Sequence, residues 1–345
     1  MRLRVMGTIV RRLALFLAFL HSPATAAQVA DLNAVAAKQL SSPDIPGVIK
    51  GGTRPIVLAT GLAGADDPIA WMNGEVIFSE PNANRLLHVD RNGNISTFIE
   101  NLHEPRGLAV DSQGRLISIQ AQDGFTALRV IYPANRADVI ADKFEGTSFS
   151  RPNDLVVDAQ GGVYFTDPGQ FPEQEAELRK TKFRLPAAIY YVAPGRPAVK
   201  VADGITRPNG ITLSPNGRVL YVNDTLGLTL TAFDVQADGS LRNARVFAKY
   251  KGRAQRAGSL EPISNADGIV VDNSGRVYAL TEAGVEVFTP TGTLLGIIPV
   301  ACNAAGARCQ GLAFAGGDKR TLYLAGQDTL LKISMVAQGF LKRVK

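Results

Sequence analysis

RPNDLVVDAQGGVYFTDP (Arg151–Pro168) and RPNGITLSPNGRVLYVND (Arg207–Asp224) are two copies of one phrase. Each copy runs from a polar Asn through a short apolar run to a turn that contains Gly, and then to a second run of β-forming residues. Two β-type runs joined by a Gly-containing turn are typical of a β-hairpin. The phrase therefore predicts the same hairpin at two places in the chain.

Four looser copies extend this pattern. They are DPIAWMNGEVIFSE (Asp67–Glu80), GLAVDSQGRLISI from Gly107, DGIVVDNSGRVYAL from Asp267 and GLAFAGGDKRTLYLAG from Gly311. Successive copies start roughly forty to sixty residues apart, which is the period of propeller blades. Gly in each turn supplies the positive φ that the hairpin requires. Six copies predict an all-β protein with the architecture of a six-bladed β-propeller.

The rest of the chain divides around this array. We expect one propeller domain over residues 59–335, because each blade contacts only its neighbours and a ring of this size can close as one unit. Residues 27–58 form an N-terminal segment with a short helix near Asp31–Leu40. This segment either packs on the rim or contributes the strand that closes the ring. Residues 336–345 are a C-terminal tail.

Residues 1–26 have the composition of a secretory signal peptide. Four arginines precede an apolar run at Leu13–Leu20, and a small-residue cleavage site ends at Ala26. The apolar run is too short for a permanent membrane span, so we expect a periplasmic or secreted protein. The pair Arg11-Arg12 leaves twin-arginine export open beside the general secretory route. Cleavage would lower the formal charge from +6 to +2.

Composition excludes several function classes. With the signal removed, no surplus of positive charge remains that would bind a phosphate backbone, so nucleic acid is not an expected partner. The chain has no G-x-S-x-G phrase, and only His88 and His103 remain after cleavage. Both histidines are undistinguished in their surroundings, which argues against Ser-His-Asp or Cys-His catalysis.

Three further features concern loops. Cys302 and Cys309 are the two cysteines of the chain, and we expect them to close a short loop as a disulfide, because a metal site would need further Cys or His ligands nearby. Two polar interruptions, Gln170–Pro186 and Lys249–Pro262, separate repeats. Each is either a solvated surface loop or a flap over a substrate pocket.

A polar residue opens several of the repeats: Asp66 or Asp67, Asn153, Asn209 and Asp267. If the repeats are equivalent blades, these side chains converge at one mouth of the central channel. Carboxylate and amide oxygens suit calcium, magnesium or manganese, and a solvated oxygen site can admit zinc. The alternative is that each Asn or Asp caps a turn through its own side chain.

Several motifs together resemble a known family. RPND at Arg151, YFTDP at Tyr164, RPNG at Arg207, NADG at Asn265 and GLAFAGGDKRTLYLAG are similar to the family of gluconolactonase, senescence marker protein and luciferin-regenerating enzyme. The resemblance covers Asp66–Ile333. It implies a six-bladed propeller with one divalent metal in the central channel, held by a Glu, two Asn and an Asp. The motifs place the two Asn at Asn153 and Asn209 and the Asp at Asp267.

The chain departs from this family in two places. The family Glu lies in an E-G-P-x-W phrase, whereas this chain has DDPIAW at Asp66–Trp71, with Asp66 in the Glu position and one residue inserted. Asp67 and Glu80 are the alternative sources of that oxygen. The C-E-H-G-N-R phrase of bacterial gluconolactonases corresponds here to Ile119–Gly124, IQAQDG, so substrate contacts in that blade are expected to differ.

The resemblance implies a metal-dependent lactonase acting on a small-molecule lactone or ester, such as a sugar-acid lactone, with calcium as the first choice of metal. Asp267 is the candidate general base, and Asp154 or Asp224 could share that role. Arg151 matches the substrate-binding Arg of the family, and Arg207 occupies the same place one blade later. The competing hypotheses are a propeller that binds a ligand or protein without catalysis, and a related esterase. No obligate protein partner is evident.

Overall fold

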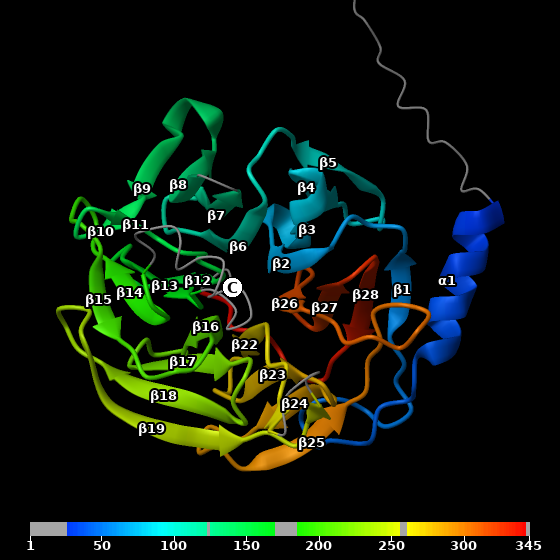
Figure 1. Ribbon diagram of the computed structural model, residues 1–345. Helices are drawn as coiled ribbons and strands as arrows, with labels where there is room; N and C mark the ends of the chain where they lie inside the picture. The colour runs from blue at the N-terminus through cyan, green and yellow to red at the C-terminus, as the bar shows by residue number, and fades with distance from the viewer. Residues whose placement is uncertain (1–25, 123–124, 170–184, 256–260, 343–345) are drawn as a thin grey trace, which may run out of the picture.

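The computed structural model describes residues 26–122, 125–169, 185–255 and 261–342. The predicted signal peptide lies outside the described residues except for its last one, and so does most of the loop predicted at Gln170–Pro186. In the described part, six antiparallel sheets of four strands each surround a central axis (Figure 1). The innermost strand of each sheet contacts the innermost strands of both neighbouring sheets. The prediction of a six-bladed β-propeller is therefore confirmed.

The strands follow one another from the axis outward in each of the first five blades. The first three blades are β2 (Asp66–Ala70), β3 (Val76–Glu80), β4 (Arg85–Val89) and β5 (Ile95–Ile99); β6 (Pro105–Val110), β7 (Leu116–Gln122), β8 (Phe125–Tyr132) and β9 (Asp138–Ala141); and β12 (Leu155–Val157), β13 (Val163–Asp167), β14 (Ala188–Val192) and β15 (Val199–Ala202). The next two are β16 (Pro208–Leu213), β17 (Val219–Asp224), β18 (Thr229–Val235) and β19 (Leu241–Lys249); and β22 (Ile269–Val271), β23 (Val277–Thr281), β24 (Gly284–Phe288) and β25 (Leu294–Ile298).

The sixth blade joins the two ends of the ring. Its inner strands are β26 (Gly311–Ala315), β27 (Thr321–Gly326) and β28 (Thr329–Ser334), and its outermost strand is β1 (Ile56–Ala59), which pairs antiparallel with β28. The N-terminal segment thus supplies a closing strand, and the ring includes residues 56–58. The helix α1 (Ala26–Lys38) precedes β1 and begins and ends earlier than the predicted Asp31–Leu40. Pairing between the first and last strands ties the ring together without leaving an open gap between blades.

The repeated phrase forms the inner hairpin of each blade. Leu155 pairs with Phe165 across β12 and β13, and Ile211 pairs with Val222 across β16 and β17. Gly161 and Gly217 occupy the intervening turns with φ of 83° and 70°, as the sequence predicts. Apolar side chains on both faces of these hairpins pack against the next blade, and this is why the inner strands are buried almost throughout.

Glycines let the inner strands of neighbouring blades approach closely. A Cβ built on Gly210 would lie 2.0 Å from the carbonyl oxygen of Asp267, and one on Gly107 would lie 2.8 Å from the carbonyl oxygen of Asn153. A Cβ on Gly311 would lie 2.5 Å from the amide nitrogen of Asp67. No side chain fits at these distances. The glycines therefore set how near to one another the polar residues at the strand starts can lie.

Buried carboxylates hold the segments that enter two inner strands. Asp167 accepts hydrogen bonds from the backbone N–H of Ser150 at 2.7 Å, Arg151 at 3.0 Å and Gly169 at 3.1 Å. Asp224 holds the equivalent segment one blade later, accepting from the N–H of Arg207 at 3.0 Å. Burial raises the pKa of Asp167 to about 6, although these hydrogen bonds lower it.

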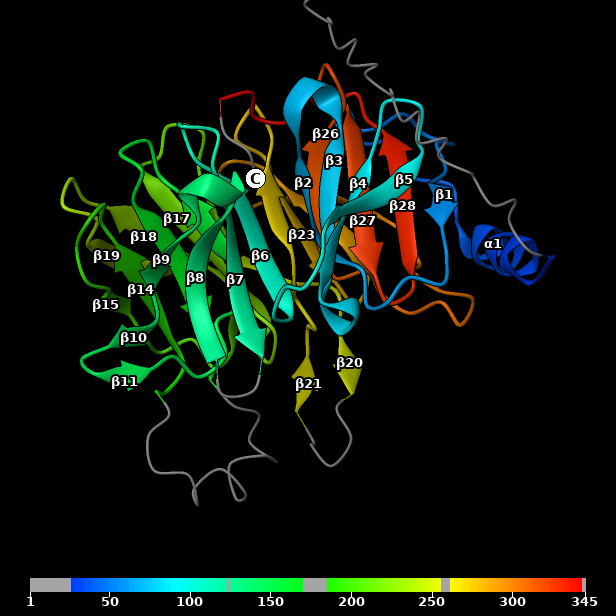
Figure 2. The same cartoon turned by 90° about the horizontal axis from the view of Figure 1, so that it is seen from above.

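Two short hairpins stand on the face where the inner strands begin. The pair β10 (Lys143–Phe144) and β11 (Thr147–Ser148) precedes β12, and the pair β20 (Ala254–Gln255) and β21 (Pro262–Ile263) precedes β22 (Figure 2). The segment predicted as a surface loop or flap at Lys249–Pro262 therefore includes strand structure. Its remaining residues, 256–260, lie outside the described part.

The C-terminal tail crosses the opposite mouth of the channel. The N–H groups of Val336 and Ala337 both donate to the carbonyl oxygen of Val48, and Gly339 forms a bridge with Asp272. Phe340 then lies beside the last residues of three inner strands, at a pocket of about 380 Å³. Those residues are Val110, Val157 and Leu213. The mouth where the inner strands begin is thus the one that the tail leaves uncovered.

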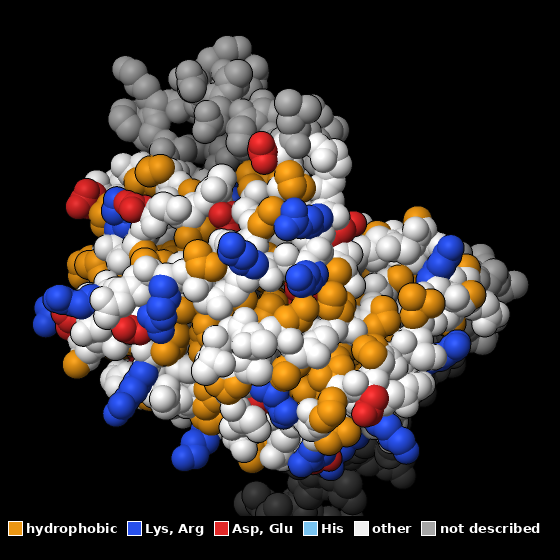
Figure 3. Space-filling model, turned by 90° about the horizontal axis from the view of Figure 1, so that it is seen from below, with side chains coloured by type: hydrophobic (Ala, Val, Ile, Leu, Met, Phe, Trp, Pro, Cys, Tyr) orange, Lys and Arg blue, Asp and Glu red, His pale blue; other side chains and the backbone are white. Residues whose placement is uncertain are grey.

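Figure 3 shows the side of the ring formed by β19 and β25, where the described lysine and arginine side chains lie mostly apart from one another.

Within the described residues, no helix has the length and apolar character to cross a membrane.

The close approach at Gly210 leads to a stability prediction. We expect Gly210→Ala to lower the free energy of unfolding by about 1–3 kcal/mol, because the new methyl group forces β16 away from the backbone of Asp267. Urea unfolding followed by circular dichroism measures the change. Gly317→Ala is the matched control, because nothing lies within 4 Å of its Cβ position. Equal stability of the two variants would contradict this explanation.

The pKa of Asp167 leads to a second prediction. Its folded-state pKa of about 6 lies above the ordinary 3.8, so the folded protein holds this proton more tightly than the unfolded chain does. The stability from this group is full below about pH 4 and is lost as pH rises through 6. Between pH 4 and 7, wild type should lose about 2 kcal/mol more than Asp167→Asn.

Urea unfolding of both proteins at a series of pH values measures this difference. Titration of the other carboxyl groups largely cancels between wild type and the variant, which leaves a stability difference that falls between about pH 4 and pH 6 and is nearly level above that range. A flat difference curve would show that Asp167 ionises in the folded protein much as it does in the unfolded chain.

Candidate functional site

One residue stands at the start of the innermost strand of every blade, at the mouth of the channel opposite the C-terminal tail. In blade order these residues are Asp66, Arg106, Asn153, Asn209, Asp267 and Gln310. The four residues predicted as metal ligands thus occupy equivalent places in four blades. Sequence analysis missed Arg106 and Gln310 because it began those two repeats one residue later, at Gly107 and Gly311. The signal that could have identified them is the Gly that follows each one, because Arg106-Gly107 and Gln310-Gly311 correspond to Asn209-Gly210.

Asp66 lies close to two other carboxylates. Its side chain is buried, and Oδ1 accepts a hydrogen bond from the N–H of Asp67 at 2.8 Å. Burial raises the pKa of Asp66 well above its ordinary value, and the charges of Asp67 and then Asp267 raise it further, while Arg106 lowers it. Carboxylates that repel one another in a buried place favour a bound cation, which relieves the repulsion.

Asn209 presents a side-chain oxygen that has no hydrogen-bond partner in the described part of the chain. Its Nδ2 donates to Thr225 Oγ1 at 3.0 Å, which sets the orientation of the amide. Its Oδ1 is buried and accepts no hydrogen bond from any described residue. The Oγ1 of Thr166 donates to the backbone carbonyl of Asn209 at 2.8 Å, and the carbonyl of Thr166 accepts from the N–H of Asn153 at 2.9 Å. Thr166 thereby links the backbones that carry the two asparagines.

Asp267 is bound by an arginine that the repeats do not reveal. Arg308 Nη1 donates to Asp267 Oδ2 at 2.9 Å, and both side chains are largely buried. Arg308 belongs to the loop that the disulfide between Cys302 and Cys309 closes, as the sequence predicts. Because the loop lies outside the repeated phrase, no sequence pattern indicated that it would reach the channel mouth.

Gln39, just after α1, holds the base of this disulfide loop. Gln39 Nε2 donates to the carbonyl oxygen of Ala301 at 2.6 Å, and Gln39 Oε1 accepts from the N–H of Ala301 at 3.3 Å. Gln39 itself is buried. The N-terminal segment therefore contributes to the placement of Arg308, besides closing the ring.

The other carboxylates considered from the sequence are engaged in the fold. Glu80 accepts a hydrogen bond from the N–H of Ala63 at 2.7 Å and forms an ion pair with Arg85. Asp154 accepts from two backbone N–H groups, of Leu155 at 2.8 Å and Ile211 at 2.9 Å. Asp224 likewise holds backbone N–H groups. Asp67 is engaged in the same way, because its Oδ2 accepts from the N–H of Gly107 at 2.7 Å. These contacts are structural, which leaves Asp66 as the carboxylate of blade 1 that lines the pocket at this mouth.

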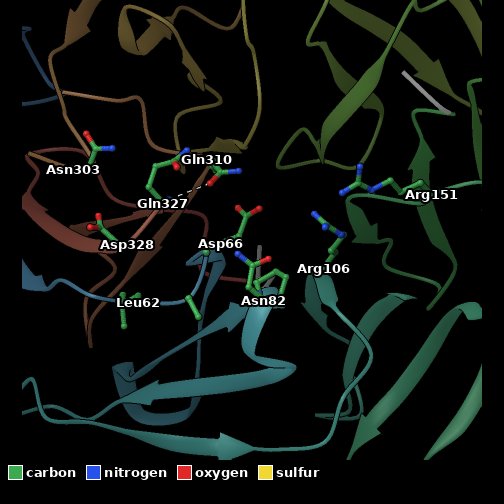
Figure 4. Close-up of a pocket in the computed structure, with 12 residues that line it drawn as sticks. Leu62, Asp66, Asn82, Arg106, Arg151, Asn303, Gln310, Gln327 and Asp328 are labelled. Atoms are coloured by element: carbon green, nitrogen blue, oxygen red, sulfur yellow. Dashed lines mark hydrogen bonds between the residues drawn. The ribbon is translucent and has the colours of Figure 1, made fainter. Parts of the chain in front are cut away.

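A pocket of about 630 Å³ opens beside Asp66. Figure 4 shows the Arg106 and Arg151 side chains extending into it toward Asp66. Its other labelled lining residues are Leu62, Asn82, Asn303, Gln310, Gln327 and Asp328. Asn153, Asn209 and Asp267 do not line it. Of the sequence-predicted residues, the structure thus places Asp66 and Arg151 in the pocket, and Asp267 near enough for its charge to raise the pKa of Asp66.

The donor set suits a hard cation. Within the described residues there is no group of three or more His, Cys, Asp or Glu side chains that could hold a metal. The candidate set instead combines two carboxylates with two amides, which are oxygen donors of the kind that calcium and magnesium prefer. The partnerless oxygen of Asn209 and the repulsion between Asp66 and Asp267 both fit such an ion. Zinc fits less well, because the set has no His or Cys.

Comparison with known proteins agrees with the motifs. Residues 68–327 match the family model described as "SMP-30/Gluconolactonase/LRE-like region". A gluconolactonase from Zymomonas mobilis is 25% identical over 276 residues, covering 74% of this chain and 75% of that protein. The lactonohydrolase oryL of Aspergillus oryzae is 25% identical over 219 residues, covering 59% of this chain and 48% of that protein.

Solved structures give the same result. A gluconolactonase from Xanthomonas campestris aligns with a TM-score of 0.68 at 25% identity, covering 86% of this chain and 97% of its own. A calcium-binding regucalcin from Agrobacterium tumefaciens aligns with a TM-score of 0.60 at 20% identity, over 82% of this chain and 94% of its own, which supports the fold alone. The chain belongs to the SMP-30/gluconolactonase/LRE-like family.

Proposed function

We propose that this protein is a lactonase that opens the cyclic ester of a sugar-acid lactone with one divalent cation, calcium as the first choice. Family membership supports the reaction class, since relatives include a gluconolactonase and a lactonohydrolase. The observation that carries the proposal is the buried, partnerless Oδ1 of Asn209 at the mouth where Asp66 and Asp267 repel each other. A polar pocket large enough for a sugar lactone adjoins it.

Asp66, Asn153, Asn209 and Asp267 are the residues that would hold the cation. When bound, such an ion supplies Lewis-acid polarisation of the lactone carbonyl and lowers the pKa of water. The fold positions these four side chains from four different blades, so their spacing depends on how closely the blades pack.

Asp267 is the residue that takes the proton from the attacking water in this proposal. Arg308 binds its Oδ2 at 2.9 Å, which holds the plane of the carboxylate and makes Oδ1 the oxygen that would contact the cation and accept the proton. A base whose second oxygen is held by a guanidinium keeps one orientation, and orientation governs the efficiency of proton transfer.

Arg151 is the residue that binds the substrate oxygens. Its backbone is fixed by Asp167, and its side chain reaches the pocket from blade 3. A guanidinium there can donate to the carbonyl or hydroxyl oxygens of a lactone and hold it beside Asp66.

Export to the periplasm or the cell exterior is part of the proposal. The N-terminal sequence supports it, and so does the disulfide, because disulfides persist in oxidising compartments. A substrate in that compartment would be a lactone formed or taken up outside the cytoplasm.

The test is lactone hydrolysis with and without metal. Acid release from glucono-δ-lactone and other aldonolactones is followed with a pH indicator, with spontaneous hydrolysis subtracted. We expect EGTA to abolish the enzymatic rate and calcium to restore it. Asn209→Ala and Asp267→Ala should each lower kcat/KM by about a hundredfold or more, because one removes a ligand and the other the base.

Asn92→Ala is the matched control, because Asn92 lies in the exposed turn between β4 and β5. It should leave the rate unchanged. A wild-type rate that chelation does not alter would rule out the metal-dependent reaction. Stoichiometric calcium binding without turnover of any lactone would favour the alternative of a ligand-binding propeller, or of an esterase with another substrate.

A further inference from the structure

Arg106 places a positive charge where the other five blades place side chains with oxygen donors. It begins the inner strand of blade 2 at the position equivalent to Asn209, and its charge lowers the pKa of Asp66. A guanidinium cannot coordinate a metal, and it repels a divalent cation held by the same ring. Asp66 offsets part of the repulsion between Arg106 and such a cation, and an anionic group of a bound ligand would offset more of it.

The contacts of Arg106 leave donors for such an anion. The side chain is 15% exposed, and its ion-pair partner Glu104 is 38% exposed, with 3.4 Å between Arg106 Nη2 and Glu104 Oε2. This pair is long and partly solvated, so it holds the guanidinium weakly. Arg106 Nε is buried and has no hydrogen-bond partner among the described residues. A buried donor without a partner is costly unless a ligand completes it.

Arg106 does not act alone in the pocket. Arg151 lines the same pocket from the next blade, and Figure 4 shows both guanidinium groups on one wall, facing Asp66. The facing wall carries the amide side chains of Gln310 and Gln327 and the carboxylate of Asp328. Amides bind hydroxyl groups, whereas paired guanidinium groups bind a carboxylate, often with two parallel hydrogen bonds.

We propose that this pocket selects lactones that carry a free carboxylate besides the ester, as the monolactones of sugar dicarboxylic acids do, and that Arg106 together with Arg151 binds that carboxylate. This inference rests on the proposed lactonase function, because it names the substrate class of the same site. The hydroxyl groups of such a lactone contact the amide wall, and its ester lies toward Asp66 and Asp267.

The first experiment measures binding, independently of turnover. Isothermal titration calorimetry at one fixed free calcium concentration compares D-glucarate with D-gluconate, which differ in a carboxylate against a hydroxymethyl group at one end. We expect wild type to bind D-glucarate at least about tenfold more tightly. Arg106→Gln should abolish this preference and change the affinity for D-gluconate by less than about threefold.

Two further variants control the experiment. Arg245 on β19 forms an exposed ion pair with Asp234 on β18. Arg245→Gln therefore removes the same charge far from the pocket and should keep the preference for D-glucarate. Arg106→Lys keeps the charge but loses the forked geometry, so it should retain only part of the preference. Circular dichroism checks that each variant is folded. If Arg106→Gln does not fold, the wild-type comparison of the two ligands decides.

Equal wild-type affinity for D-glucarate and D-gluconate would overturn the inference. An equal loss of affinity for the two ligands in Arg106→Gln would also overturn it, because Arg106 would then bind the carboxylate that both ligands share. The second experiment compares the hydrolysis of D-glucaro-1,4-lactone and D-glucono-1,4-lactone, which share a ring size. We expect at least about a tenfold higher kcat/KM for the first.

These outcomes separate the inference from the proposed function. Hydrolysis of both lactones at the same rate, with no preference in binding, would leave the lactonase in place and reject the acidic substrate class. An Arg106-dependent preference for D-glucarate without hydrolysis of any lactone would reject the lactonase and keep the carboxylate site.

Discussion

The backbone contact between neighbouring inner strands is the constraint on which the rest of this structure depends. Gly210 lies against the carbonyl of Asp267, and Gly107 lies against that of Asn153, at distances that admit no Cβ. Because the blades meet this closely, residues far apart in the sequence share one small mouth. The dipeptide Asn-Gly at 209–210 combines two roles: Asn209 supplies a candidate ligand oxygen, and Gly210 allows the backbone of the next blade to approach.

Supports outside the repeated phrase complete this mouth. Asp167 and Asp224 bind the backbone that leads into two of the inner strands, and the disulfide loop brings Arg308 onto Asp267. Gln39 in the N-terminal segment holds that loop in turn. The C-terminal tail covers the opposite mouth. The N-terminal segment and the tail therefore do more than close the ring, because the segment braces the mouth where the inner strands begin and the tail crosses the other mouth.

Charge at the open mouth is balanced between buried acids and guanidinium groups. Burial raises the pKa of Asp66 well above its ordinary value, and the charges of Asp67 and then Asp267 raise it further. Arg308 interacts with one of these acids and Arg106 with the other. An arrangement of this kind suits a ligand with both an electrophilic and an anionic group, because each charge then has a partner.

The sequence by itself determined the fold class, the number of blades and the disulfide, because a hairpin needs only a local pattern of apolar runs and Gly turns, and six copies leave few ways to bury their faces. It also indicated Asp66, Asn153, Asn209 and Asp267, since equivalent positions in a ring converge. Tertiary structure alone decided that Glu80, Asp154 and Asp224 serve the fold, and that Arg106 and Arg308 join the mouth. Those roles depend on which backbone N–H or carboxylate from another blade or loop lies within hydrogen-bonding distance, and no local pattern carries that information.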